Sequence, residues 1–199
     1  MLVLPRTIEA ILIGTALLLA GCVRQPQREP GADVSAVRAR SDAPSLYDLS
    51  SNWRDQQGAT RTLSSFRGRA VVLAAVYTRC SASCPLTVIE MKRIEAATDR
   101  NIRLVLISLD PETDTPARLA VFAQQHELAA SRWTLLNGSE EALRDLTVSL
   151  GVRYRRLSRD EIAHSNLVTL LDANGSVVSQ QAGIAGADSL IAAAHALSR

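Results

Sequence analysis

The chain has 199 residues, of which 47% are hydrophobic and 4% aromatic. That length is enough for one domain with a substantial core plus additional segments. The 22 Lys and Arg residues nearly balance the 20 Asp and Glu residues, and Lys92 is the only lysine. The arginines alternate with acidic residues and form no basic stripe, which argues against a nucleic-acid-binding protein and indicates an ordinary solvated surface.

The predicted lipoprotein signal peptide covers residues 1–21. Its apolar run, residues 10–21, is too short for a membrane span, which needs about 20 such residues. The run ends in residues 19–22, Leu-Ala-Gly-Cys, which resemble the bacterial lipobox, whose cysteine is lipidated and becomes the mature N-terminus. We therefore expect an exported protein, lipid-anchored through Cys22 to a bacterial membrane and facing the periplasm or the cell exterior. The alternative is an ordinary signal peptide cut near Ala20, with a free cysteine.

A polar segment rich in Pro, Arg and Ala, residues 22–44, follows the signal peptide and has no helical or strand period. We expect it to be a flexible tether that keeps the domain near membrane-bound partners. The folded domain is then expected over residues 45–199. It begins with a possible short strand at residues 46–49, followed by a turn at residues 57–59.

The rest of this domain alternates apolar runs, which predict buried strands, with capped amphipathic segments, which predict helices. Strands are expected at residues 70–77, 102–108 and 132–136. Helices are expected at about 85–98, after the pair Thr115 and Pro116, and at 139–150 before Gly151. A hairpin of strands 166–171 and 176–180 and a last helix at about 188–197 complete the domain. This order predicts an α/β fold with a mixed sheet.

Cys80 and Cys84, with Pro85 directly behind, lie where strand 70–77 ends and the next helix begins. Unpaired N–H groups and the positive end of the helix dipole favour thiolate over thiol at such a place. Because thiolates attack disulfides and bind soft metals, the position predicts redox or metal chemistry. A dithiol at the first strand–helix junction is typical of a thioredoxin-like mixed sheet with flanking helices. Residues 139–150 are then an inserted helix, and the segment before the domain is an N-terminal extension.

The two cysteines enclose three residues, whereas a thioredoxin redox motif encloses two. The longer loop is compatible with a disulfide and also with an ion held between the sulfurs. Two thiolates suit Cu(I), and an imidazole suits copper or zinc, so a third ligand has to come from elsewhere. We expect packing or surface roles for His126 and His195, which lie on predicted helices. His164 lies in a polar loop before strand 166–171, and in a thioredoxin-type sheet that loop faces the dithiol.

Three motifs together resemble the Sco/SenC family, copper proteins of cytochrome c oxidase assembly. Residues 77–86, Tyr-Thr-Arg-Cys-Ser-Ala-Ser-Cys-Pro-Leu, resemble the family's cysteine motif. Residues 108–116, Ser-Leu-Asp-Pro-Glu-Thr-Asp-Thr-Pro, resemble its Ser-Val-Asp-Pro and Asp-Thr-Pro segment. His164 falls where the family's metal-binding histidine lies, and the resemblance extends from about residue 46 to the C-terminus.

The resemblance implies a thioredoxin-like fold in which Cys80, Cys84 and His164 bind one copper ion. Asp110, within the second motif, is expected either to orient or charge-balance the site or to cap a loop. Ser81 stands where the family usually has Pro, which allows a more flexible loop and leaves the balance between copper carriage and thiol exchange open.

The function implied by the resemblance is a membrane-anchored copper metallochaperone. It would deliver copper to, or prepare, the binuclear copper site of a cytochrome c oxidase subunit, with other periplasmic copper carriers or thiol reductants as further partners. The alternative is a thiol–disulfide oxidoreductase in which Cys80 attacks a partner disulfide and Cys84 resolves the mixed species. A peroxiredoxin-type peroxidase and an adventitious zinc site are weaker alternatives. The peroxidase needs Thr three residues before its cysteine, whereas Thr78 is two before Cys80.

Overall fold

The computed structural model describes residues 45–183 and 186–197. The predicted signal peptide at 1–21, the tether at 22–44 and the lipidation site Cys22 lie outside these residues. Across the two described ranges, no helix has the length and apolar character needed to cross a bilayer.

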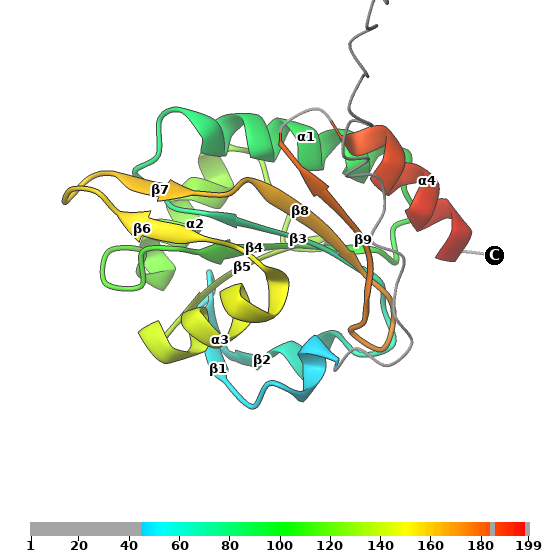
Figure 1. Cartoon of the computed structure of the whole chain (residues 1–199), viewed down its shortest axis with the longest axis horizontal. Helices are drawn as coiled ribbons and strands as arrows, with labels where there is room; N and C mark the ends of the chain where they lie inside the picture. Colours follow the sequence, from blue (N-terminus) through cyan, green and yellow to red (C-terminus); the bar gives the residue numbers. More distant parts are fainter. Residues whose placement is uncertain (1–44, 184–185, 198–199) are drawn as a thin grey trace, which may run out of the picture. The chain divides into compact units, whose positions relative to one another are not determined.

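A seven-stranded mixed sheet with the order β2-β1-β5-β4-β3-β8-β9 forms the centre of the fold (Figure 1). Its strands β3, β4 and β5 run parallel, whereas β8 is antiparallel to β3 and β1 is antiparallel to β5. Every residue of β3 is buried, as expected for a strand that is covered on both faces. The strands are β1 (Asn52–Asp55), β2 (Thr60–Thr62), β3 (Val71–Val76), β4 (Arg103–Ser108), β5 (Trp133–Gly138), β8 (Leu167–Leu171) and β9 (Val177–Ala182).

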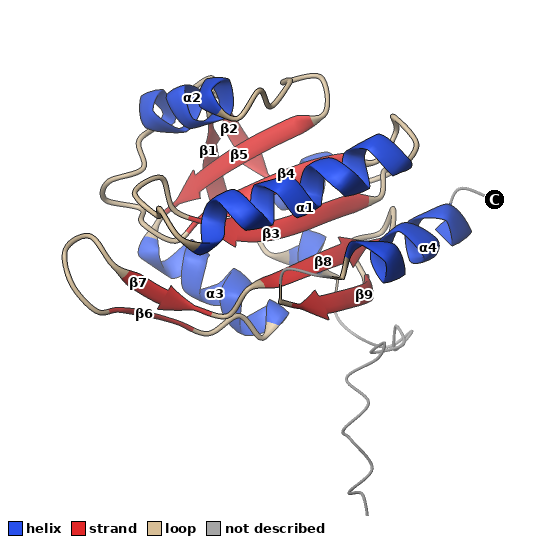
Figure 2. Ribbon diagram, turned by 90° about the horizontal axis from the view of Figure 1, so that it is seen from above, coloured by secondary structure: helices blue, strands red, loops and turns tan. Residues whose placement is uncertain are grey.

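Helices cover both faces of this sheet. In Figure 2, α1 (Ser83–Ala97), α2 (Pro116–Gln125) and α4 (Ala187–Leu197) lie in front of the sheet, and α3 (Glu140–Leu150) lies behind it. Right-handed connections between parallel strands place α1 and α2 on the same face, since β3, β4 and β5 follow one another in one direction across the sheet. The architecture therefore agrees with the predicted mixed α/β fold.

Capping residues explain where α2 begins and where α3 begins and ends. The Thr115 hydroxyl accepts from the backbone N–H of Arg118 before α2, and the Ser139 hydroxyl accepts from that of Ala142 before α3. Gly151 ends α3 in the left-handed region, with a φ of 69°. These caps agree with the sequence pattern. Helix α1 begins two residues earlier than expected, at Ser83.

A two-stranded sheet of β6 (Tyr154–Arg156) and β7 (Ile162–His164) stands apart from the main sheet. In Figure 1 it is the yellow arm that precedes β8 and continues beyond the end of that strand. His164 is the last residue of β7 and pairs with Tyr154 across the hairpin. The expectation of a polar loop at His164 was therefore wrong, because strands of three residues with exposed flanks leave no period in the sequence.

The start of the domain also differs from the prediction. The expected strand at residues 46–49 is a 3₁₀ helix, η1 (Leu46–Asp48), because the Ser45 hydroxyl accepts from the backbone N–H of Tyr47 and turns the chain. The predicted turn at 57–59 is present, but the β1–β2 hairpin around it was not foreseen. A second 3₁₀ helix, η2 (Leu63–Phe66), leads from β2 towards β3.

Packing of α3 on the sheet is tested by a pair of alanine substitutions in that helix. Leu146 is 1% exposed and Val148 is 74% exposed. We expect Leu146→Ala to lower the free energy of unfolding by about 2–5 kcal/mol, because it leaves a cavity in the core. We expect Val148→Ala to change it by less than about 0.5 kcal/mol. Urea unfolding measures both values. Equal effects of the two substitutions would contradict the packing of α3.

Candidate functional site

The cysteine loop joins the end of β3 to the start of α1, and its own hydrogen bonds bring the two sulfurs together. The backbone N–H of Cys80 donates to the Tyr77 carbonyl at 3.1 Å, which turns the chain directly after the strand. Cys84 lies in the first turn of α1, and its backbone N–H donates to the Cys80 Sγ at 3.3 Å. Both thiols are free, and Cys84 is buried while Cys80 is partly exposed.

The two thiols have opposite acid–base character. Burial raises the pKa of the Cys80 thiol, but hydrogen bonds from the side chain and backbone N–H of Cys84 and from Ser83 outweigh this effect and lower it to about 7. Burial raises the pKa of the Cys84 thiol far above its usual value, and the neighbouring Cys80 raises it further. The expected thiolate therefore forms readily only at Cys80. Cys84 lies in the first helical turn, but its desolvation outweighs the favourable helix end.

A buried carboxylate fixes the beginning of this loop. Asp114 is fully buried and accepts hydrogen bonds from the Thr78 backbone N–H at 3.1 Å and from the Thr78 hydroxyl at 2.5 Å. It also accepts from the Ser108 hydroxyl, at the end of β4, at 2.6 Å. Sequence reasoning missed this residue. The available signal was its place in the second motif, but the contact with Thr78 joins residues 36 positions apart and is visible only in the fold.

His164 presents a neutral imidazole with one free nitrogen. Its Nδ1 lies 3.3 Å from the Ser165 carbonyl, and because a carbonyl only accepts, this nitrogen carries the proton. The other nitrogen, Nε2, is buried and has no hydrogen-bond partner. Burial lowers the pKa of the ring, which keeps it neutral. A neutral ring held through one nitrogen, with a lone pair on the other, is the form in which histidine binds metals.

Tyr77 contacts both the hairpin that carries His164 and the cysteine loop. Its ring meets the His164 ring edge-on, with the centroids 6.1 Å apart at an interplanar angle of 80°. Its hydroxyl accepts from the backbone N–H of Ile162, in β7, at 3.3 Å. Burial raises the pKa of this tyrosine, and a side-chain hydrogen bond with Cys80 adds to the effect. One side chain thus contacts both the cysteine loop and the hairpin.

The structure brings Cys80 and Cys84 together, and Tyr77 contacts both Cys80 and His164. Over residues 45–183 and 186–197, no three side chains of His, Cys, Asp or Glu are close enough together to hold a metal ion. For one ion to be held by all three residues, their side chains have to come closer together than they lie in this structure. The other two histidines have the packing and surface roles expected. The His126 ring packs on the Phe122 ring, with the ring centroids 4.3 Å apart. Nε2 of His195, an exposed residue, lies 2.7 Å from the Ala97 carbonyl oxygen.

Comparison with known proteins decides the family. The sequence model of SCO1/SenC matches residues 44–199. The chain belongs to the SCO1/SenC family. It is 23% identical over 138 residues to the SCO1 homologue of Bacillus subtilis, which covers 66% of this chain and 72% of that protein. It is 26% identical over 176 residues to a SCO2-like protein of Rickettsia conorii, which covers 83% of this chain and 82% of that protein.

Solved structures of SCO1/SenC proteins show the same fold. A SCO1/SenC family lipoprotein of Bacillus anthracis superimposes with a TM-score of 0.68 at 24% identity, over 77% of this chain and 96% of that one. Bradyrhizobium japonicum ScoI, solved with copper bound, superimposes with a TM-score of 0.63 at 24% identity, over 75% of this chain and 96% of that one. These likenesses confirm the predicted thioredoxin-like architecture.

The asymmetry of the thiols in this SCO1/SenC protein predicts a simple pH dependence of alkylation. With a pKa of about 7, Cys80 is mostly protonated and slow below pH 7 and mostly thiolate above it. We expect its rate with iodoacetamide to rise through a midpoint near pH 7, while Cys84 reacts far more slowly throughout. Fragmentation of the peptide that carries both cysteines, by tandem mass spectrometry, assigns the label to Cys80 or Cys84.

Replacing the hydrogen-bonding neighbour provides the control. In Cys84→Ala the side-chain donor to Cys80 is lost, so the alkylation midpoint of Cys80 should move upward. An unchanged midpoint, or a midpoint above about 8.5, the usual value for cysteine, in the unsubstituted protein would show that the loop does not stabilise the thiolate.

Proposed function

We propose that this SCO1/SenC protein is a copper metallochaperone. It binds one copper ion through Cys80, Cys84 and His164 and delivers it to, or prepares, the binuclear copper site of cytochrome c oxidase. Family membership supports the proposal, as do the relatives whose structures were solved with copper bound, from Bradyrhizobium japonicum and Arabidopsis thaliana. The oxidase as acceptor follows from the family resemblance of the sequence motifs.

The observation that carries the proposal is the free nitrogen of His164. A buried polar atom without a partner is unfavourable, and a bound metal ion would satisfy this one. The His164 ring contacts Tyr77, whose hydroxyl also interacts with Cys80. Two sulfurs and one imidazole are the soft and intermediate donors that copper prefers.

Each cysteine has a distinct part in the proposed transfer. Cys80 is available as a thiolate near neutral pH and is partly exposed, so it is suited to receive the ion from one protein and release it to another. Cys84 has to lose its proton when the ion binds, so binding releases protons and strengthens as the pH rises. A partner's own thiolates then replace these ligands one after another.

The cellular setting of the proposal rests on the N-terminal sequence. A lipid on Cys22 and the tether at residues 22–44 would hold the domain on the outer face of a bacterial membrane. That position would keep the copper site within reach of a membrane-bound oxidase subunit and of other periplasmic copper carriers or thiol reductants.

Thiol–disulfide exchange is a second candidate function, and the split of the two thiol pKa values favours it. An exchange protein needs an accessible cysteine of low pKa to attack and a protected one to resolve the mixed disulfide. Cys80 and Cys84 have these properties in that order. Copper carriage additionally needs His164, whereas disulfide exchange does not.

Copper titration of the reduced full-length protein tests the first function. We expect one Cu(I) ion to bind per chain, measured by competition with a chromophoric chelator. We expect His164→Ala to weaken binding by about 100-fold or more, since loss of a ligand should exceed the 10–100-fold effect of losing an outer partner. His195→Ala is the matched control and should bind as the unsubstituted protein does. Equal affinity of the His164→Ala variant would exclude this histidine as a ligand.

Disulfide reduction tests the second function. We expect the reduced protein to reduce oxidised glutathione and His164→Ala to do so at an unchanged rate. In Cys84→Ser the reaction should stop at a mixed disulfide on Cys80, because the resolving thiol is missing. Mass spectrometry detects the trapped species. Failure to form it, while copper binding persists, would leave metal carriage as the single function of this cysteine pair.

A further inference from the structure

A buried carboxylate links the cysteine loop to the hairpin that carries His164. Asp110, two residues after the end of β4, is 1% exposed. One of its oxygens accepts from the Arg79 guanidinium and the other from the Arg156 guanidinium, each at 2.7 Å. Arg79 directly precedes Cys80, and Arg156 lies in β6, where it pairs with Ile162 of β7. One side chain therefore holds residues from both parts of the candidate site.

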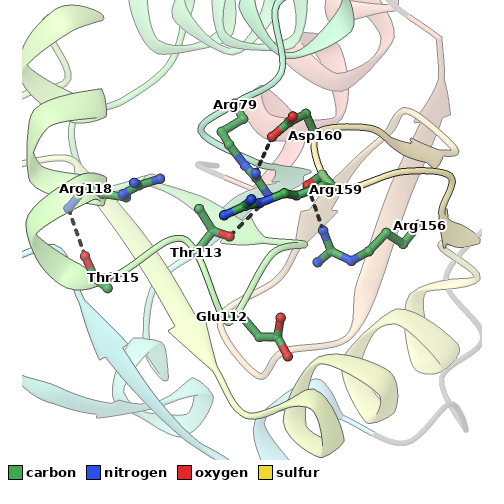
Figure 3. Close-up of a pocket in the computed structure, with 8 residues that line it drawn as sticks. All are labelled: Arg79, Glu112, Thr113, Thr115, Arg118, Arg156, Arg159 and Asp160. Carbon is green, nitrogen blue, oxygen red and sulfur yellow. Dashed lines mark hydrogen bonds and ion pairs between the residues drawn. The ribbon is translucent and has the colours of Figure 1, made fainter.

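Further contacts of Arg79 reach the tip of the same hairpin. Its guanidinium forms an ion pair with Asp160, between β6 and β7, and donates to the Thr113 hydroxyl at 3.2 Å. Figure 3 shows Arg79 and Asp160 pointing towards one another above Thr113, with Arg156 to the right of them. Asp160 is 75% exposed, so solvent weakens its pair, whereas the Asp110 carboxylate is shielded.

The hairpin has few other attachments to the body of the domain. It forms a sheet of its own, with no strand ladder to the seven-stranded sheet. The backbone N–H of Ile162 donates to the Tyr77 hydroxyl, and the His164 ring lies against that tyrosine. The Ile162 side chain is buried. The hairpin that carries His164 is thus held by the apolar contacts of Ile162 and Tyr154, by Tyr77, and by the charged contacts with Asp110 and Arg79.

We propose that Asp110, Arg79 and Arg156 form a clamp that holds the His164 hairpin over the cysteine loop and thereby sets the affinity for copper. The proposal rests on the proposed function. Asp110, Arg79 and Arg156 act as positioning residues, because none of them donates to the ion. The clamp joins Arg79 of the cysteine loop to Arg156 of the hairpin through Asp110. Without these contacts the hairpin is less restrained, and His164 can move away from the sulfurs. A ligand that is less restrained costs more entropy to fix when the ion binds.

Arg156 is the member of the clamp whose removal is informative. Without it, Asp110 keeps its ion pair with Arg79, so no buried charge is left unpaired and the domain should still fold. Removing Asp110 instead would leave two guanidinium groups facing one another. Arg155 provides a matched control, because it lies in the same strand, carries the same charge and has no side-chain hydrogen bond or ion pair to any residue that the structure describes.

The first arm of the test uses the copper-free protein. Hydrogen exchange of the backbone amides of residues 154–165 is compared in the full-length protein and in Arg156→Met, Arg155→Met and Arg156→Lys. We expect exchange to be several-fold faster in Arg156→Met and unchanged in Arg155→Met. Arg156→Lys should retain most of the protection, because the lysine ammonium group can still form an ion pair with the Asp110 carboxylate. Equal exchange in the two methionine variants would overturn the clamp.

The second arm measures the copper complex. We expect Arg156→Met to weaken copper binding about tenfold, as is typical for the loss of a partner that orients a ligand. Its Cu(II) electron paramagnetic resonance spectrum should show weakened coupling to a histidine nitrogen. Arg155→Met should change neither quantity. Tighter binding by Arg156→Met would overturn the proposal, since the clamp would then hold His164 away from the sulfurs.

The two arms separate the clamp from the proposed function. If the unsubstituted protein forms no copper complex that depends on His164, the proposed function fails. Faster exchange in Arg156→Met alone would then still support the clamp as a restraint on the hairpin. If copper binding depends on His164 but is the same in Arg156→Met and Arg155→Met, the clamp fails and the proposed function stands.

Discussion

The hydrogen bonds of the buried Asp114 carboxylate are the constraint on which the site depends. The loop between the buried strand β3 and helix α1 has to connect these two elements and still expose the Cys80 sulfur. Asp114 satisfies both the backbone and the hydroxyl of Thr78 and ties them to Ser108 at the end of the neighbouring strand. The loop therefore starts from a fixed point, and Cys80 and Cys84 meet because of it.

From this fixed point the two thiols acquire different chemistry. The backbone N–H of Cys84 donates to the Cys80 sulfur, and each cysteine shifts the pKa of the other. Donors gathered around Cys80 stabilise its thiolate, whereas the desolvated interior keeps the proton on Cys84. The same asymmetry serves disulfide exchange and the stepwise uptake and release of a soft ion. What separates the two uses is the imidazole on the hairpin, whose contacts with the rest of the domain include Ile162, Tyr77, Arg79 and Asp110.

Much of the fold was readable from local patterns. The apolar run of β3 and the caps at Thr115 and Ser139 appear in the structure where the sequence places them. The predictions of two short elements were wrong. The 3₁₀ helix at Leu46–Asp48 was expected as a strand, and the hairpin around His164 was expected as a loop. Three residues are too few for a hydrophobic period, so their conformation depends on distant partners such as Tyr77, 85 positions from Ile162.

The sequence by itself determined that the two cysteines lie between a strand and a helix, because these segments follow one another directly along the chain. Its resemblance to the family motifs identified His164 as the candidate third ligand. The tertiary structure alone decided how these residues relate: how far apart the pKa values of the two thiols lie, that Tyr77 contacts both Cys80 and His164, and that Asp110 joins Arg79 to Arg156. The physical reason is that desolvation and ion pairing depend on the surroundings of an atom in space. Those surroundings are built from residues tens of positions apart along the chain.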